Sequence, residues 1–142
     1  MKDKIVAVSG GFDPIHSGHV RYIQDAALLG KVIVFLNSDS FLKRKKGYVF
    51  MTEDERRYIL SHIKNVWAVV DVIDKDQSVK ETLRHYKPDI FAKGGDRTLD
   101  NIPEKEICEE LGIEMVFNVG GGKIASSSDL IERCIKEYQN KH

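Results

Sequence analysis

The chain has 142 residues, the usual size of one domain, with 42% hydrophobic and 31% charged residues, as expected of a globular protein. Lys+Arg and Asp+Glu both number 22, and the resulting net charge of zero argues against a dedicated nucleic-acid or membrane-surface binder. No apolar stretch approaches the roughly 18 residues of a transmembrane helix, and the N-terminal one is too short for a signal peptide. Cys108 and Cys134 are isolated, which is typical of unpaired thiols in a reducing compartment. We therefore expect a cytoplasmic protein with one domain over residues 1–142.

Strands and helices are predicted to alternate along the whole chain. Apolar runs closed by polar residues or glycines predict strands over residues 5–9, 31–36, 67–73, 88–92 and 113–118. Apolar residues at helical spacing predict helices over residues 19–29, 52–63, 78–85 and 102–111, and a last helix that starts at 126–128. Residues 40–50 are basic and are expected to form an irregular loop. This alternation predicts an α/β fold: a Rossmann-like, doubly wound, mostly parallel five-stranded sheet with helices on both faces.

Four local expectations add detail to this fold. Thr52 followed by Glu55 is a capping-box pattern, which predicts the start of the second helix. The polar tail, residues 136–142, is expected to fray. Trp67 is expected in the core, with a position at an interface between copies as the alternative. The last helix is predicted to turn its apolar residues inward: Leu130, Ile131 and Cys134.

Polar or glycine-rich segments follow four of the predicted strands. They are residues 10–19, 37–39, 93–97 and 120–128. In an open parallel sheet, ligands bind beyond the carboxyl ends of the strands. Because packing does not require rare residue types to gather at this edge, their presence predicts a binding site there.

The segment Gly10-Gly11-Phe12-Asp13-Pro14-Ile15-His16-Ser17-Gly18-His19 carries the strongest signal for chemistry. Its glycines let the backbone approach a ligand, and His16 and His19 fall on one side of the first turn of the following helix. Backbone N–H groups at a helix start favour an anion. Two imidazoles beside them therefore suit a triphosphate and the charge that develops on a leaving pyrophosphate. A two-histidine metal site is the alternative, but such sites usually need a third ligand and i, i+4 spacing.

This segment resembles the signature of the HxGH cytidylyltransferase-like nucleotidyltransferase superfamily. Two further segments match the same family in order along the chain. Glu55-Arg56 matches a helix position after the basic loop, and residues 125–131, ASSSDLI, resemble the family's ISSTxII element. The resemblance covers nearly the whole chain, and it points to the branches of heptose-1-phosphate adenylyltransferase and glycerol-3-phosphate cytidylyltransferase.

The resemblance also implies the site residues. It assigns catalysis to His16, His19, Lys46 and Arg56, and nucleotide binding to Gly11, Phe12, Asp13, Gly18, Lys45, Lys93, Gly95, Asp96, Ser126, Ser127 and Ser128. The histidines would stabilise the transferring and leaving phosphates, and Arg56 would reach a phosphate of the nucleotide or the acceptor. Either Lys45 or Lys46 would close over the α-phosphate. Asp13 would lie near the phosphates, with a local turn as its alternative role.

The reaction implied by this family needs no nucleophilic side chain. An acceptor phosphate attacks the α-phosphorus and pyrophosphate leaves, so catalysis is positioning and charge neutralisation. Mg²⁺ would enter on the triphosphate, without a metal site of the protein's own. The partners would be a nucleoside triphosphate and a phosphorylated small-molecule acceptor, and two copies of the chain would form a homodimer.

The choice of nucleotide and acceptor stays open between two branches. Residues 37–39 and 92–96 favour ATP and a sugar phosphate, whereas the three serines also fit CTP and glycerol 3-phosphate. Two other classes remain as alternatives: a nucleotide-binding regulatory module without catalysis, and a small α/β interaction protein.

Overall fold

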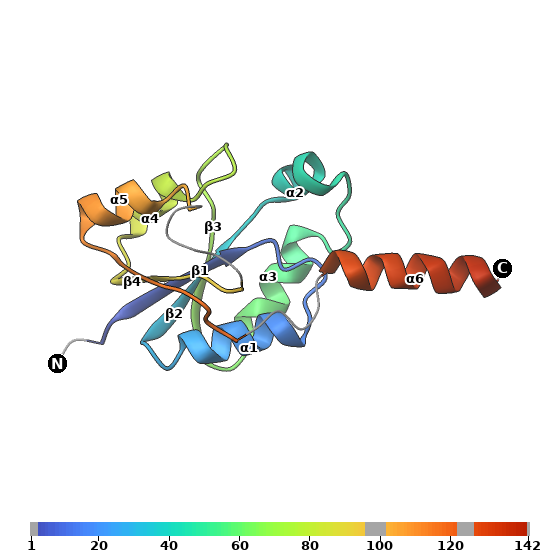
Figure 1. Cartoon of the computed structure of the whole chain (residues 1–142), viewed down its shortest axis with the longest axis horizontal. Coiled ribbons are helices and arrows are strands. Elements are labelled where there is room, and N and C mark those ends of the chain that lie inside the picture. Colours follow the sequence, from blue (N-terminus) through green and yellow to red (C-terminus); the bar gives the residue numbers. More distant parts are fainter. Residues whose placement is uncertain (1–2, 96–101, 122–126, 142) are drawn as a thin grey trace.

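Five parallel strands form the central sheet of the computed structural model, which describes residues 3–95, 102–121 and 127–141 (Figure 1). The strands are β1 (Ile5–Gly10), β2 (Lys31–Leu36), β3 (Val66–Asp71), β4 (Ile90–Ala92) and β5 (Glu114–Val116). The helices are α1 (Ser17–Ala26), α2 (Asp39–Lys46), α3 (Glu53–Ser61), α4 (Lys80–Tyr86), α5 (Lys105–Leu111) and α6 (Ser127–Lys141). The predicted strands and helices are all present, with boundaries that differ by a few residues.

The strand order is β3-β2-β1-β4-β5, and every neighbouring pair is parallel. The chain therefore builds the sheet outward from β1 to β3 on one side and from β4 to β5 on the other. Where the direction switches, a crevice forms beside the carboxyl ends of the strands, and ligands of open α/β sheets bind in this place. The predicted doubly wound α/β fold is confirmed, and within the described residues the sheet is entirely parallel.

Helices cover both faces of the sheet, because residues along each strand alternate between the two faces. On one face, Val6 of β1 belongs to a buried cluster with Ile23 of α1 and Leu60 of α3. On the other face, Leu83 of α4 and Ile107 of α5 pack in a second buried cluster with strand residues. Burial on both faces explains why the central strands appear in the sequence as continuous apolar runs.

Residues 40–50 do not form the irregular loop that the sequence predicted. Most of them belong to α2, which begins after Ser38, whose hydroxyl accepts the backbone N–H of Phe41 (3.1 Å). The helix ends at Gly47, which adopts a left-handed conformation with a φ of 88°. Only Phe41 and Leu42 are buried and the last turn is basic, so the segment shows little helical periodicity. Its lysines are therefore presented from a helix.

Two predictions about apolar burial are wrong. Trp67 is 55% exposed because β3 is an edge strand, and Lys31 Nζ lies 5.7 Å from its ring centroid. Helix α6 does not bury its predicted inner face, since Leu130 is 37% exposed and Cys134 is exposed, and it continues to Lys141 through the tail expected to fray. Figure 1 shows α6 projecting away from the sheet. Neither α6 nor any other described helix is long and apolar enough to cross a membrane.

Candidate functional site

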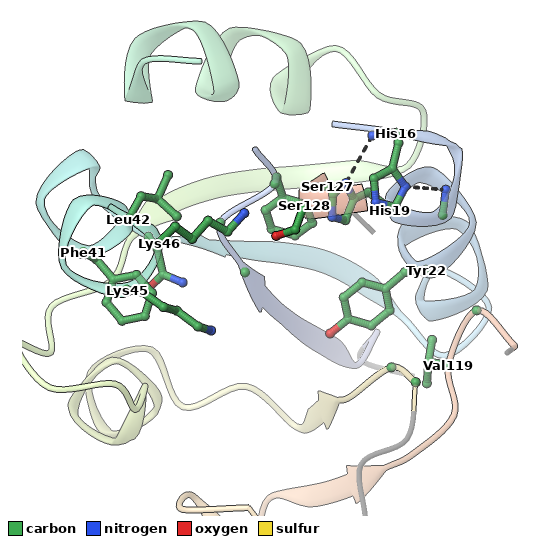
Figure 2. A pocket seen from close by; sticks show the side chains of 18 of the residues that line it. His16, His19, Tyr22, Phe41, Leu42, Lys45, Lys46, Val119, Ser127 and Ser128 are labelled. Carbon is green, nitrogen blue, oxygen red and sulfur yellow. Dashed lines mark hydrogen bonds between the residues drawn. The ribbon is translucent and has the colours of Figure 1, made fainter. Parts of the chain in front are cut away.

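A cavity of about 390 Å³ lies at the carboxyl ends of β1 and β4 (Figure 2). Segments that are far apart in the sequence line it: the turn after β1, the first turns of α1, α2, the turns after β4 and β5, and the first turn of α6. The volume is typical of a small-molecule site. The cavity lies at the edge of the sheet where the sequence predicted a ligand.

His16 and His19 face the cavity from the start of α1. His16 is the N-cap, and its Nδ1 accepts the backbone N–H of Gly18 (3.0 Å), while Nδ1 of His19 accepts the N–H of His16 (3.2 Å). The two side chains thus form a reciprocal capping box. Their rings stack with centroids 3.9 Å apart. The spacing of the HxGH motif is therefore also the spacing that starts the helix.

Both histidines are neutral at pH 7, with the ring proton on Nε2. Burial lowers the pKa of His19 to about 4, and repulsion from His16, when that ring is protonated, and from Lys46 adds to this effect. Burial, followed by the charge of Lys46, also lowers the pKa of His16. Because each Nδ1 accepts a backbone N–H, the proton of the neutral ring must lie on Nε2. Each ring can therefore donate one hydrogen bond to an anionic oxygen in the cavity.

Two lysines of α2 line the cavity together with the histidines. Lys46 Nζ donates to the backbone oxygen of Asp13 (3.1 Å), and Lys45 Nζ lies 5.7 Å from the ring centroid of Phe41. Burial is the main cause that lowers the pKa of Lys46, and the Asp13 carboxylate opposes it. Figure 2 shows both lysine side chains extending from α2 into the cavity. An anion bound here would meet neutral N–H donors from α1 and ammonium groups from α2.

The first turn of α6 lines a further part of the cavity. Ser127 and Ser128 lie there, and Ser127 Oγ donates to the backbone oxygen of Pro14 (2.8 Å). This bond ties α6 to the turn that carries the histidines. The N-terminus of a helix, here one of 15 residues, favours negative charge. The position suits phosphate binding, which stays a prediction for these two serines.

Two glycines that line the cavity have no room for a side chain. A Cβ on Gly18 would lie 2.8 Å from Cε1 of His16, so a larger residue would displace the imidazole. Gly120 has a φ of 90°, and a Cβ there would lie 2.9 Å from the Cα of Tyr22. Tyr22 lines the cavity and donates its hydroxyl to the backbone oxygen of Ala92. The close approach of the Gly120 turn to α1 therefore requires a residue without a side chain.

The model of a family described as cytidylyltransferase-like matches residues 7–133. The chain belongs to this family. The bifunctional protein HldE of Pelobacter propionicus is 37% identical over 140 residues, which cover 95% of this chain and 28% of that protein. HldE of Geobacter sulfurreducens is 37% identical over 142 residues, with the same coverage. The chain thus spans 28% of the length of these relatives.

A solved structure supports the fold independently. The crystal structure of the lipopolysaccharide core biosynthesis protein from Thermoplasma volcanium superposes with a TM-score of 0.69 at 24% sequence identity. The match covers 82% of this chain and 96% of that one. At this level of identity, the likeness shows the fold alone.

Membership of the cytidylyltransferase-like family confirms the family and the nucleotidyltransferase class that the motifs predicted. The cavity brings together most of the residues that the resemblance assigned to the site: Gly11, Phe12, His16, Gly18, His19, Lys45, Lys46, Gly95, Ser127 and Ser128. Two others, Asp96 and Ser126, lie outside the described residues. The individual contacts assigned to all these residues stay predictions.

Three predicted site residues do not line the cavity. Arg56 and Asp13 are both 0% exposed and are hydrogen-bonded to protein groups. Lys93 Nζ lies 4.0 Å from a carboxylate oxygen of Glu104 and 4.9 Å from the ring centroid of Phe91. The buried, protein-bonded position of Arg56 does not support the direct phosphate contact that the resemblance implied for its side chain. The resemblance placed Asp13 near the phosphates and implied mainly backbone contacts around Lys93, and both expectations stay predictions.

Sequence reasoning missed four apolar or aromatic residues of the cavity: Tyr22, Phe41, Leu42 and Val119. Tyr22 follows His19 by three residues on the same helix, and this spacing could have predicted that both side chains lie on the face toward the cavity. Phe41 and Leu42 were missed because α2 was not predicted. Val119 precedes the glycine turn and carries no sequence signal of its own.

Proposed function

We propose that the chain transfers AMP from ATP to the phosphate of a sugar 1-phosphate and releases pyrophosphate. The observation that carries this proposal is the joint placement of the neutral His16–His19 pair and of Lys45 and Lys46 in one cavity beside two helix N-termini. Such a site suits a triphosphate, because it combines N–H donors with cations. Similarity to the HldE proteins over most of this chain supports the heptose-1-phosphate adenylyltransferase branch.

The reaction follows from these groups. An oxygen of the acceptor phosphate attacks the α-phosphorus of ATP, the bond from that phosphorus to the bridging oxygen breaks, and pyrophosphate leaves with the bonding electrons. The Nε2–H groups of His16 and His19 would donate to oxygens that gain negative charge. Lys45 or Lys46 would hold the α-phosphate between acceptor and leaving group. The chain supplies positioning and charge, and no side chain becomes covalently linked.

Mg²⁺ fits this proposal as a companion of the nucleotide. In the described part of the chain, no group of three or more His, Cys, Asp or Glu side chains could hold a metal ion. Phosphate oxygens would therefore provide most of its ligands, as is usual for Mg²⁺ at nucleotide sites. When bound, the ion would neutralise part of the triphosphate charge.

CTP with glycerol 3-phosphate is the second candidate pair. The serine-rich start of α6 favours it, because this segment also fits stand-alone cytidylyltransferases. Residues 37–39 and 92–96 favour ATP.

The proposed enzyme would act in the cytoplasm and as a homodimer. The cytoplasm suits an enzyme that consumes a nucleoside triphosphate and carries the unpaired thiols of Cys108 and Cys134. Ile135 and Tyr138 are exposed and lie three residues apart on α6, so this helix would provide the surface on which two copies pair, and light scattering across a range of concentrations tests the pairing.

Pyrophosphate release by the purified chain tests the function. The chain is incubated with Mg²⁺ and either ATP or CTP, and with either heptose 1-phosphate or glycerol 3-phosphate. We expect the highest kcat/KM with ATP and the sugar phosphate. His16→Ala and His19→Ala should each lower kcat by about 10²–10³ with nucleotide binding retained, and His85→Ala, at an exposed position on α4, is the matched control.

Three outcomes would contradict parts of the proposal. Release with CTP alone would exclude the adenylyl reaction. Unchanged turnover in both histidine variants would exclude the mechanism. Nucleotide binding without turnover for every acceptor would favour the regulatory module.

A further inference from the structure

Arg56 is buried beside the cavity and binds four protein groups at once. It is 0% exposed and is among the largest fully buried side chains of the described residues. Nη1 donates to the backbone oxygens of Gly11 (2.8 Å) and Asn37 (2.7 Å), which follow β1 and β2. Nε donates to the backbone oxygen of Met51 (3.0 Å), and Nη2 forms a 2.7 Å ion pair with Asp39, the first residue of α2. One guanidinium thus connects the ends of β1 and β2 to the first residue of α2 and to Met51, which follows α2.

Asp13, which belongs to the segment that carries His16 and His19, also binds α2 and the residues that follow it. Its carboxylate accepts the backbone N–H groups of Phe50 (2.7 Å) and Met51 (2.5 Å). Its backbone oxygen accepts Nζ of Lys46, the last residue of α2. Residue 13 therefore contacts the end of α2 and the connection that follows it. The segment 39–51 is held at its start by Arg56 and at its end by Arg56 and Asp13.

This network fixes where α2 lies relative to the sheet. A buried guanidinium is stable only while its partners are in place, because removing one leaves a desolvated charge or an unpaired acceptor. The partners of Arg56 lie on three separate segments, so α2 cannot shift without breaking a buried bond. Because α2 carries Lys46, which lines the cavity, a shift of α2 would move a side chain of the cavity wall. Displacements of about 1 Å are enough to slow a positioned reaction.

We propose that Arg56 is a positioning residue that acts through Lys46: together with Asp13 and Asp39, it holds α2 where Lys46 reaches the nucleotide phosphates. The contact between Lys46 and a nucleotide phosphate rests on the proposed function, whereas the positioning of α2 by Arg56 does not. The competing role is a direct contact between Arg56 and a phosphate, as the family resemblance implied.

Two variants weaken the network, and a third is the control. Arg56→Lys keeps the charge but cannot donate to four separated groups. Asp39→Ala removes one partner, whose side chain is 39% exposed, so this variant remains testable if Arg56→Lys does not fold. Arg57→Ala alters the neighbouring arginine, which pairs with Glu53 and Asp71 and does not line the cavity.

Amide hydrogen exchange of the ligand-free chain measures the hold on α2. We expect exchange over residues 39–51, including the amides of Phe50 and Met51, to become about tenfold faster or more in both network variants, since each loses charge-assisted hydrogen bonding of Arg56. The Arg57→Ala variant should match the wild type. Unchanged exchange in this segment would overturn the proposal, and this result does not depend on any enzymatic activity.

A double-mutant cycle with Lys46→Ala distinguishes positioning from direct contact. Arg56→Lys alone should lower kcat about tenfold or more, with a smaller effect on KM for the nucleotide. In the Lys46→Ala background it should cost less than about twofold, because the residue through which it acts is absent. Losses that multiply would overturn the proposal and favour direct phosphate contact. If the wild type transfers no nucleotidyl group, the proposed function fails, and the exchange experiment still decides the role of Arg56.

Discussion

Protonation of His19 should destabilise the folded chain at mildly acidic pH. Its pKa is lowered from 6.5 to about 4, mainly by burial. Between these values the unfolded chain binds the proton and the folded chain does not, so stability is lost as the pH falls from 6.5 to 4. One pKa unit corresponds to about 1.4 kcal/mol, so the full loss is on the order of 3 kcal/mol, a large part of the total stability of a small domain.

Urea unfolding followed by far-UV circular dichroism at pH 7 and pH 4 measures this loss. His19→Asn is the informative variant, since its side-chain oxygen can replace Nδ1 as the acceptor for the His16 N–H without titrating. The pH dependence of the wild type should exceed that of the variant by about 3 kcal/mol, and His85→Asn should behave as the wild type. Equal pH dependence in wild type and His19→Asn would refute the reasoning. So would an NMR titration that places the pKa of His19 at 6 or higher.

Other substitutions test the geometry of the cavity. Gly18→Ala should displace the His16 ring and lower kcat by about 10² while the far-UV spectrum stays native, because its Cβ would lie 2.8 Å from Cε1 of that ring. Lys46→Ala should lower kcat by about 10–10³, whereas Lys43→Ala, on the same helix but outside the cavity lining, should leave it within about twofold. Gly120→Ala should cost about 1–3 kcal/mol in urea unfolding, because a φ of 90° strains any residue with a Cβ.

The fold was predictable from the sequence because its signals are strong and local. The buried strands appear as apolar runs, and glycines or capping residues bound the helices. Helix α2 was missed because only two of its residues face the core and its remaining positions are polar. The exposure of Trp67 and of the apolar face of α6 was missed for a different reason. Periodicity identifies a strand or helix, but it does not say which neighbour covers it.

The site was predictable only at the level of segments. The motifs correctly indicated that the histidines, the basic segment and the last helix would meet, because the carboxyl ends of parallel strands lie at one edge. They did not distinguish a side chain that faces the cavity from one that faces the protein. Arg56 and Arg57 are adjacent and chemically identical, yet one is fully buried and the other is partly exposed. That difference depends on which backbone carbonyls the fold brings around the guanidinium. Two of them belong to Gly11 and Asn37, which are far from Arg56 in the sequence, so a local pattern does not reveal them.

The capping box at the start of α1 explains why neutral histidines suit this site. The chemical step is accelerated only by interactions that are stronger in the transition state than in the ground state. A neutral Nε2–H donor would bind a ground-state phosphate less strongly than a cation would, and in the proposed reaction its hydrogen bond would strengthen as negative charge builds on the leaving pyrophosphate. The backbone N–H groups of His16 and Gly18 keep both Nδ1 atoms unprotonated, which leaves the proton on the nitrogen available to a ligand. The hydrogen bonds that cap the start of α1 are thus the same ones that place the ring protons on Nε2. Folding of this turn therefore also sets the two side chains in the tautomer that can donate to a ligand.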